Sequence, residues 1–288
     1  MRPEQDDIAR LGGARSEIGE QALRQFREAV LEHYRQHGRD LPWRSTRDPY
    51  AILVSEVMLQ QTQVSRVVPK YEEFLRAFPT VQALADAPLA EVLRVWSGLG
   101  YNRRAKALHE AARKILEEHG GTVPCSYAEL RMLPGVGHAT AAQVLAFAYG
   151  VPVPYLETNI RAALIHWFFP GREAVTDREL MPLAEAVLDR EDPRVWHYAI
   201  MDYGAALKRR VPNPSRRSAH HAKQKPFAGS MREARGAVLR VLARRERASV
   251  EEIAVESGIH ARRIRAAAAA LVREGLVVRA GRGWRLAR

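Results

Sequence analysis

Apolar residues recur at helical spacing along most of the chain. Leu23, Phe26, Val30 and Tyr34 follow one another at intervals of three or four residues, and this run stops at Gly38. Such spacing places the apolar side chains on one face of an amphipathic helix. Alternating strand patterns are missing from the sequence before residue 270. We therefore expect an all-α region that ends near residue 207.

The same periodicity predicts the other helices of this region. Residues 50–78 should form two helices, with Pro69 at or near the break between them, because proline interrupts a helix interior. Further helices are expected at residues 88–96, 103–118, 127–133, 140–149, 158–168, 177–188 and 194–207.

A change of composition at Lys208 marks the end of the helical region. Residues 208–230 hold three prolines and seven Lys and Arg residues, and almost nothing apolar. Such a segment cannot build a core, so we expect a linker or an extended arm. The N-terminal residues 1–15 should be disordered.

Residues 231–288 predict a small second domain. Helices are expected at 232–245, 250–257 and 260–274, followed by short strands at 276–279 and 284–286. This order is typical of a winged helix-turn-helix. A small α+β domain that pairs with another protein is the alternative. Nucleic acid is favoured by arginines on the third helix and the hairpin, namely Arg262, Arg263, Arg265, Arg279, Arg282 and Arg285.

Composition limits the class of protein. The chain has 288 residues, 47% of them hydrophobic, which suffices for one large or two ordinary domains. Its 45 Lys and Arg against 33 Asp and Glu give a net charge of +12, which indicates a polyanionic partner. The sequence lacks an apolar run long enough to span a membrane and a signal-peptide pattern near its start. We therefore expect a cytoplasmic protein.

Cysteine content limits the chemistry further. Cys125 is the single cysteine of the sequence. One thiol cannot form an intramolecular disulfide, a zinc site of several thiolates or a four-thiolate iron–sulfur cluster.

The most specific segment runs from Leu133 to Ala141, with the sequence LPGVGHATA. Two glycines around one apolar residue predict a tight hairpin between helices, and Gly137 leads into the second helix. Free backbone N–H groups at a helix start bind phosphate without reading sequence. We expect phosphate contacts from Gly135, Val136, Gly137 and Thr140. An ordinary helix–helix turn is the alternative.

This hairpin resembles that of the helix-hairpin-helix (HhH-GPD) DNA glycosylase superfamily. Further motifs are similar to its MutY-like adenine glycosylase branch, in the same order along residues 20–207. They are residues 41–44 (LPWR), 48–50 (DPY), 54–64 (VSEVMLQQTQV), 78–80 (FPT), 87–89 (APL), 98–101 (GLGY), 155–161 (YLETNIR) and 201–205 (MDYGA). The resemblance implies a two-lobed, mainly α glycosylase domain at 16–207, followed by the basic arm at 208–230 and the winged helix at 231–288.

The resemblance also implies the catalytic residues. Base excision needs an acid that protonates the leaving base and a carboxylate that stabilises the cationic sugar. The family pattern puts the acid at Glu56, and a carboxyl group in an apolar setting retains its proton more readily. The second carboxylate corresponds to Glu157, where the family has aspartate, and Asn159 helps to hold the site. A surface glutamate and a helix N-terminal residue are the respective alternatives.

Two departures from the family affect the mechanism. Bifunctional members carry a lysine nucleophile two residues after the second glycine of the hairpin, where this chain has Ala139, so we expect a monofunctional enzyme. The family's four cluster cysteines begin near Lys208, and this chain has none there. We expect no cofactor and no Fe–S cluster, with a structural monovalent cation at the hairpin as the alternative. His220 and His221 lack the further ligands that a metal site needs.

Other side chains are assigned to DNA by the same resemblance. Gln60 and Gln61 are candidates for the wedge that replaces a flipped base, and Tyr101 matches a tyrosine that intercalates beside the opposite base. Trp43 and Arg44 are similar to residues that line the purine pocket, with core packing as the alternative. Arm residues that could contact phosphate are Arg209, Arg210, Arg216, Arg217, Lys223 and Lys225.

The expected function is base excision from double-stranded DNA by a monomeric enzyme. The most favoured substrate is adenine mispaired with oxidised guanine or guanine. A glycosylase for another damaged purine or a mismatched pyrimidine is one alternative, motivated by Glu157 and Ala139. A non-catalytic DNA-binding protein on the same scaffold is the other.

Overall fold

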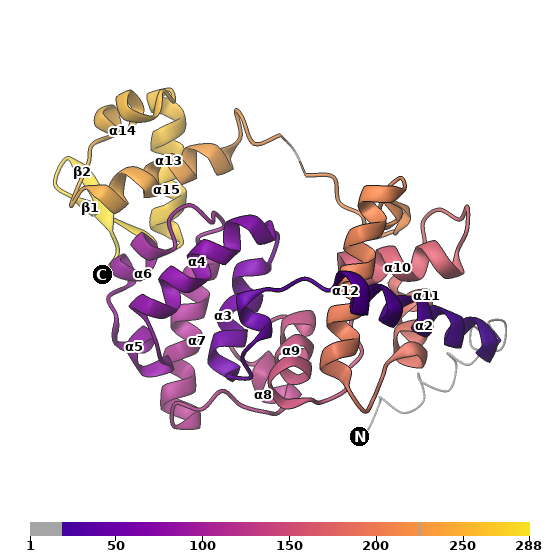
Figure 1. Ribbon diagram of the computed structural model, residues 1–288. Helices are drawn as coiled ribbons and strands as arrows, with labels where there is room; N and C mark the ends of the chain where they lie inside the picture. The colour runs from indigo at the N-terminus through magenta and orange to yellow at the C-terminus, as the bar shows by residue number, and fades with distance from the viewer. Residues whose placement is uncertain (1–18, 225) are drawn as a thin grey trace, which may run out of the picture. The chain divides into compact units, whose positions relative to one another are not determined.

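The computed structural model describes residues 19–224 and 226–288 (Figure 1). The expected disordered segment 1–15 and the arm residue Lys225 lie outside the described residues. Within them the chain is mainly α, with fourteen α-helices and a single two-stranded sheet. No helix in this part of the chain is both long and apolar enough to cross a membrane.

The chain forms two compact units, each built from two separate segments. Unit 1 comprises residues up to Arg47 together with His138–Lys223. Unit 2 comprises Asp48–Gly137 together with Gln224–Arg288. Each unit therefore has its own core.

Unit 1 is a helical layer around a cluster of aromatic rings. Phe26 lies at its centre, fully buried, with the rings of Trp167, Phe168 and Trp196 between 5.2 and 6.2 Å away. The elements are α2 (Glu20–His37), the 3₁₀ turn η2 (Pro42–Arg44), α9 (His138–Val144), the π-helical turn η3 (Leu145–Tyr149), α10 (Thr158–Phe168), α11 (Asp177–Val187), α12 (Pro193–Arg210) and the 3₁₀ turn η4 (Pro214–Arg217).

Close packing of α12 on α10 depends on Gly204. A Cβ atom at Gly204 would lie 2.0 Å from the carbonyl oxygen of Asn159, so no larger residue fits between the two helices. Lys208 follows four residues later on α12, which places it on the same helix face. The first turn of α10 and the last turns of α12 are thereby brought together.

Unit 2 contains the first helical segment and the C-terminal module, defined as residues 231–288. The first segment holds α3 (Pro49–Leu59), α4 (Val64–Ala77), α5 (Val81–Asp86), α6 (Leu89–Val95), α7 (Arg103–His119) and α8 (Tyr127–Arg131). The C-terminal module holds α13 (Met231–Arg244), α14 (Val250–Ser257), α15 (Ala261–Arg273) and the strands β1 (Val277–Ala280) and β2 (Gly283–Leu286). The strands pair antiparallel, with Val277 opposite Leu286 and Ala280 opposite Gly283.

The C-terminal module is attached to α7 through Glu274. Its backbone carbonyl accepts a hydrogen bond from Lys106 Nζ at 3.0 Å. Its carboxylate accepts two hydrogen bonds from Arg235 of α13, at 2.7 and 2.5 Å. The hydrogen bonding with Arg235 is the main reason that the pKa of Glu274 lies below its ordinary value, so Glu274 is ionised at neutral pH.

Two details of the sequence prediction are wrong. Pro69 lies inside α4, and the break after α3 falls instead at residues 60–63, where Gln61 has a left-handed backbone with φ of 54°. The short helix α5 was not predicted. Elsewhere α12 continues to Arg210, three residues into the segment expected to be a linker.

Candidate active site

Glu56 is carried by the most buried helix of unit 2. Nine of the eleven residues of α3 are buried, and only 4% of the surface of Glu56 is exposed. The helix starts where Asp48 accepts hydrogen bonds from the backbone N–H groups of Tyr50 and Ala51, a regular N-cap. Glu56 is therefore buried within a mostly apolar helix and is not a surface glutamate, and its role as the acid stays a prediction.

Arg104 holds the end of α3, a role that the sequence did not indicate. Its guanidinium donates hydrogen bonds to the carbonyls of Val57 and Met58 at 2.8 Å and of Gln60 at 2.6 Å. It also bonds Thr62 Oγ1 at 2.9 Å. Burial lowers the pKa of Arg104 to about 10, which still leaves it charged at neutral pH. The last carbonyls of a helix normally need such donors.

Gln60 and Gln61 lie directly after this cap. The side chain of Gln60 donates to the carbonyl of Gly135 at 3.2 Å, which links the end of α3 to the hairpin. Gln61 is exposed and has a left-handed backbone. Tyr101 also has a positive φ, 47°, and 36% of it is exposed. Gln60, Gln61 and Tyr101 are thus all on strained or tightly held turns.

The hairpin after α8 is a tight turn with unequal glycines. Gly135 has φ of 76°, and a Cβ atom there would lie 2.8 Å from Cβ of Ala107. A Cβ atom at Gly137 would meet nothing closer than 4.0 Å. Val136 is buried and donates its N–H to the carbonyl of Leu133 at 3.1 Å. Thr140, in α9 of unit 1, is also buried.

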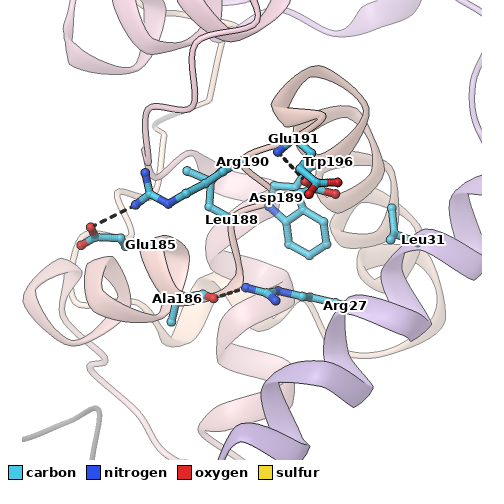
Figure 2. Close-up of a pocket in the computed structure, with 9 residues that line it drawn as sticks. All are labelled: Arg27, Leu31, Glu185, Ala186, Leu188, Asp189, Arg190, Glu191 and Trp196. Atoms are coloured by element: carbon cyan, nitrogen blue, oxygen red, sulfur yellow. Dashed lines mark hydrogen bonds and ion pairs between the residues drawn. The ribbon is translucent and has the colours of Figure 1, made fainter.

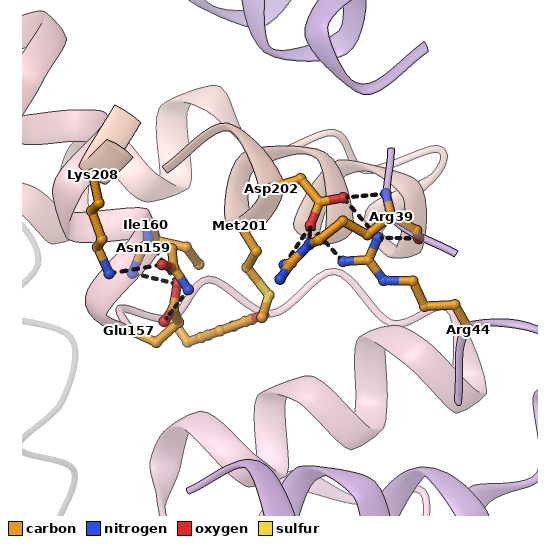
Figure 3. A network of polar contacts seen from close by, with 9 residues as sticks. Arg39, Arg44, Glu157, Asn159, Ile160, Met201, Asp202 and Lys208 are labelled. Atoms are coloured by element: carbon orange, nitrogen blue, oxygen red, sulfur yellow. Dashed lines mark hydrogen bonds and ion pairs between the residues drawn. The ribbon is translucent and has the colours of Figure 1, made fainter. Parts of the chain in front are cut away.

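Glu157 is fixed at the N-terminus of α10 in unit 1 (Figure 3). Its Oε1 accepts hydrogen bonds from the backbone N–H groups of Asn159 at 2.7 Å and Ile160 at 2.8 Å. Its Oε2 accepts a third hydrogen bond from Asn159 Nδ2 at 3.1 Å. The carboxylate is therefore oriented by three N–H donors, and the helix dipole favours its charge.

Lys208 extends this network. Its Nζ donates to Asn159 Oδ1 at 2.8 Å, so that Lys208, Asn159 and Glu157 form a chain of hydrogen bonds (Figure 3). Burial lowers the pKa of Lys208, and the negative charge of Glu157 opposes part of that shift. Sequence reasoning treated Lys208 only as the start of the arm, because the contact depends on the packing of α12 against α10.

Trp43 is buried in unit 1, and the side chain of Arg44 beside it is 7% exposed. Arg44 donates to Asp202 twice, through Nη1 at 2.8 Å and Nη2 at 2.7 Å, and its guanidinium lies 4.3 Å from the ring centroid of Tyr198. Arg39 donates to the same carboxylate (Figure 3). Burial alone would raise the pKa of Asp202, but the hydrogen bonds from Arg44 and Arg39 hold it below its ordinary value. Arg44 is thus engaged in an internal ion pair, and its role in a base pocket stays a prediction.

The arm residues differ in their availability. Arg217 caps the end of α10, where Nη1 donates to the carbonyl of Phe169 at 2.6 Å. Its own carbonyl accepts from the backbone of Val175 at 2.9 Å. Arg216 and Lys223 are exposed. Arg217 therefore has a structural task, whereas the phosphate contacts of Arg216 and Lys223 stay predictions.

One hollow of unit 1 contains none of the predicted site residues. It has a volume of about 510 Å³ and lies between α2 and the connection from α11 to α12 (Figure 2). Arg27 crosses it and donates to the carbonyls of Val187, at 2.9 Å, and Ala186. This arginine caps the end of α11, so the hollow is part of the helix packing.

Comparison with known proteins shows which family and which enzymes this chain resembles. A family model described as HhH-GPD superfamily base excision DNA repair protein matches residues 54–188. The adenine DNA glycosylase of Mycobacterium tuberculosis is 40% identical over 62% of this chain and 60% of its own length. The thymine/uracil-DNA glycosylase of Pyrobaculum aerophilum is 36% identical over 62% of this chain and 80% of its own length.

A solved structure agrees with the sequence matches. The structure of a thermostable thymine-DNA glycosylase aligns with a TM-score of 0.59 and 29% identity, over 64% of this chain and 87% of that chain. The chain spans 36% to 60% of the length of the adenine DNA glycosylases that it matches. The two glutamates and the hairpin all lie inside the segment that the family model covers.

Proposed function

Because the chain belongs to the HhH-GPD superfamily of base excision DNA repair proteins, we propose that it is a DNA glycosylase. One observation carries the proposal, namely the contrasting settings of the two glutamates. Glu56 is enclosed in the apolar helix α3, which suits an acid. Glu157 is oriented by three N–H donors, which suits a group that is positioned to stabilise a cationic sugar.

The proposed reaction is hydrolysis of an N-glycosidic bond. Glu56 transfers its proton to a ring nitrogen of the flipped base, and the electron pair of the C1′–N bond leaves with the base. The negative charge of Glu157 stabilises the cationic sugar that remains. Water then adds its oxygen to C1′ and releases a proton. The products are a free base and an abasic site in an intact strand.

The test of this assignment is Glu56→Gln, which keeps the shape and removes the acid. We expect base release to fall by at least about 10²-fold, in the range of a lost general acid, with duplex affinity unchanged. Glu117→Gln, an exposed residue of α7, is the matched control and should retain full activity. Unaltered release by the Glu56 variant would refute the acid assignment, and no release by the wild type from any duplex would favour the non-catalytic binding protein.

The enzyme is proposed to be monofunctional. Ala139 has no nucleophile, whereas a lyase of this family forms a Schiff base with a lysine. Lys208 is the lysine described beside Glu157, and its Nζ is engaged with Asn159. Borohydride should therefore trap no protein–DNA adduct, and the strand should break only after hot alkali. An adduct that disappears in Lys208→Met would instead identify Lys208 as a nucleophile.

The proposed substrate is adenine opposite oxidised guanine or guanine. The support is the similarity to proteins named adenine DNA glycosylase, at 32% to 40% identity. The second candidate is a mismatched pyrimidine or another damaged base, favoured by the similarity to the thymine/uracil-DNA glycosylase. A panel of duplexes with single mismatches or lesions, each followed by alkali, separates the two. Release from adenine mispairs supports the first, and release from thymine or uracil mispairs alone supports the second.

Three further features belong to the same proposal. The enzyme works without an iron–sulfur cluster, since four thiolates cannot be drawn from a chain with a single cysteine. The order of three helices and a hairpin in the C-terminal module is that of a winged helix. The exposed Arg216 and Lys223 contact the phosphates of double-stranded DNA.

A further inference from the structure

A basic groove lies wholly within unit 2, beside the end of α3. It has a volume of about 1090 Å³, slightly above the roughly 300–1,000 Å³ of pockets that enclose small ligands. One wall is drawn from residues within 60–66 and 93–104, and the other consists of Gln224, Phe227 and one face of α13. The C-terminal module therefore supplies six of the 21 lining residues, all of them from α13.

The lining has one sign of charge. Six arginines contribute to it, three from each wall, and none of the described lining residues is Asp or Glu. They are Arg66, Arg103, Arg104, Arg232, Arg235 and Arg240. A cleft lined by one sign of charge concentrates ligands of the opposite sign. The groove is thus suited to a polyanion.

Exposed apolar side chains are placed among these arginines. Tyr101, Phe227 and Met231 line the groove, and Phe227 is 56% exposed. The hydroxyl of Tyr101 accepts hydrogen bonds from Gln224 and, at 3.3 Å, from Arg232, so both walls hold this ring. Aromatic rings next to cationic side chains are the usual combination in grooves that bind a nucleic-acid strand through base stacking and phosphate contacts.

Gly236 leaves the α13 wall open. It lies in the middle of α13, where glycine destabilises a helix relative to alanine. A Cβ atom at this position would meet nothing within 4 Å, so the packing of the protein does not require glycine.

Two of the three described non-glycine residues with a left-handed backbone, Gln61 and Tyr101, also line the groove. Such local cost is typical of functional surfaces.

The third helix of the C-terminal module, α15, also carries paired arginines. On α15, Arg263 donates to Glu233 at 2.9 Å and to the carbonyl of Ser230 at 3.0 Å. Arg265 lies 3.8 Å from Glu251. Two of the three α15 arginines that the sequence assigned to nucleic acid are therefore near carboxylates of their own module.

We propose that this groove binds one strand of DNA, so that the C-terminal module engages DNA through α13 and not through α15 and its hairpin. The inference rests on the proposed function for the choice of DNA as the polyanion. Arg104 caps α3, and Arg103 and Arg235 pair with Glu274. Backbone phosphates therefore contact Arg66, Arg232 and Arg240, and an unstacked base lies against Tyr101 and Phe227. The module then acts as a second wall of the DNA site beside Gln60 and Gln61.

The first experiment fills the groove without harming the helix. Gly236→Leu improves helix propensity, so the thermal midpoint should be unchanged or higher. We expect its affinity for a duplex with an abasic-site analogue to fall at least about tenfold, about 1.4 kcal/mol. Ala269→Leu adds the same side chain to an exposed position of α15 and should bind as the wild type. Since no base is released in this assay, its result does not depend on catalysis.

The second experiment removes charge from each surface. Arg240 of α13 and Arg262 of α15 are both exposed. Arg240→Ala should lower the slope of log Kd against log salt by about 0.9, as expected for the loss of one phosphate contact. Arg262→Ala should leave the slope unchanged. The proposal would be overturned if Arg262→Ala lowered the slope and Arg240→Ala did not. It would also be overturned if Ala269→Leu weakened binding and Gly236→Leu did not, since either result would favour binding by α15.

A photo-crosslink locates the strand directly. Iodouracil placed opposite the abasic-site analogue, or next to it, should join to the peptide that contains Tyr101 or Phe227. Crosslinks confined to residues 260–288 would overturn the proposal, and so would the absence of any crosslink in unit 2. A groove crosslink in a protein that releases no base would refute the proposed catalysis and leave the groove assignment intact.

Discussion

The two glycines of the hairpin are close in sequence, yet the geometry requires glycine only at the first. Gly135 combines a positive φ with a contact that leaves no room for a Cβ atom. Gly137 has neither constraint. A glycine that the fold does not need is explained by a ligand that approaches the backbone closely.

This difference predicts separate outcomes for the two alanine variants. Gly135→Ala should destabilise the protein by about 1–2 kcal/mol, the cost of a left-handed backbone for an L-residue. The free energy of unfolding of Gly137→Ala should lie within about 0.5 kcal/mol of the wild-type value, but this variant should bind duplex DNA more weakly. Thermal unfolding and a binding titration check both. Normal affinity of the Gly137 variant would contradict the phosphate contact.

His197 predicts how stability depends on pH. It is 2% exposed, stacks on Tyr155 with 4.6 Å between ring centroids, and donates from Nδ1 to the carbonyl of Pro193 at 2.7 Å. Burial lowers its pKa from 6.5 to about 4, and the hydrogen bond offsets only part of this shift. Between these values the unfolded chain binds a proton that the folded protein excludes, so stability falls as the pH falls.

The expected loss from His197 is about 2 kcal/mol between pH 7 and pH 5. His197→Phe keeps a ring in the stack and should remove most of this dependence. The exposed His221→Phe should retain the wild-type dependence. Denaturant unfolding at the two pH values provides the measurement. An equal change in the free energy of unfolding between pH 7 and pH 5 for all three proteins would contradict the role of His197.

At the scale of elements, the end of α3 depends on an arginine from another helix. Arg104 of α7 bonds the last carbonyls of α3 and the Thr62 side chain. Removing it leaves several buried carbonyls without donors, which is costly. The segment with Gln60 and Gln61 is therefore only as rigid as this contact.

Arg104→Met should lower the free energy of unfolding by about 2–4 kcal/mol, given several hydrogen bonds from one charged group. Arg104→Lys should retain only part of the stability that Arg104→Met loses, because an ammonium lacks the planar set of five donors. Hydrogen exchange of the Thr62 amide, which bonds Leu59, should accelerate in both variants. Unchanged exchange would show that another contact holds the segment.

Helix positions were predictable where the apolar pattern is long. The expected bounds of α10, residues 158–168, are those observed, and α7 differs by one residue. The six-residue helix α5 was missed because its pattern is too short, although Thr80 before it is an N-cap that bonds Ala83. Pro69 misled because an interior proline weakens a helix without always ending it.

The candidate site was predictable only in part, for a related reason. Glu56, Glu157 and the hairpin are local sequence features, and motif similarity identified them. Arg104 and Lys208 act through contacts made across 44 to 49 residues. Such contacts follow from tertiary packing, as when Gly204 lets α12 approach α10, and a single sequence carries no direct signal of them.

At the scale of the whole molecule, the charge of +12 should appear in the salt dependence of DNA binding. Each phosphate contact contributes about 0.9 to the slope of log Kd against log salt. Arg216→Ala and Lys223→Ala should each reduce the slope by about that amount and leave the thermal midpoint unchanged. Arg217→Ala should lower the midpoint instead, because Arg217 caps α10. A stable Arg217 variant with a reduced slope would contradict this division.

The division into two discontinuous units has a consequence for synthesis on the ribosome. Helix α2 is made early, but the carbonyl of Val187 that receives Arg27 emerges 160 residues later. At about 5–20 residues per second, the apolar face of Phe26 and Val30 waits for roughly 10–30 s before its partners exist. Unit 1 is complete only after the chain has crossed between the units twice, and unit 2 only after a third crossing. The nascent N-terminal helix is therefore the part of this protein with the greatest expected need of a chaperone.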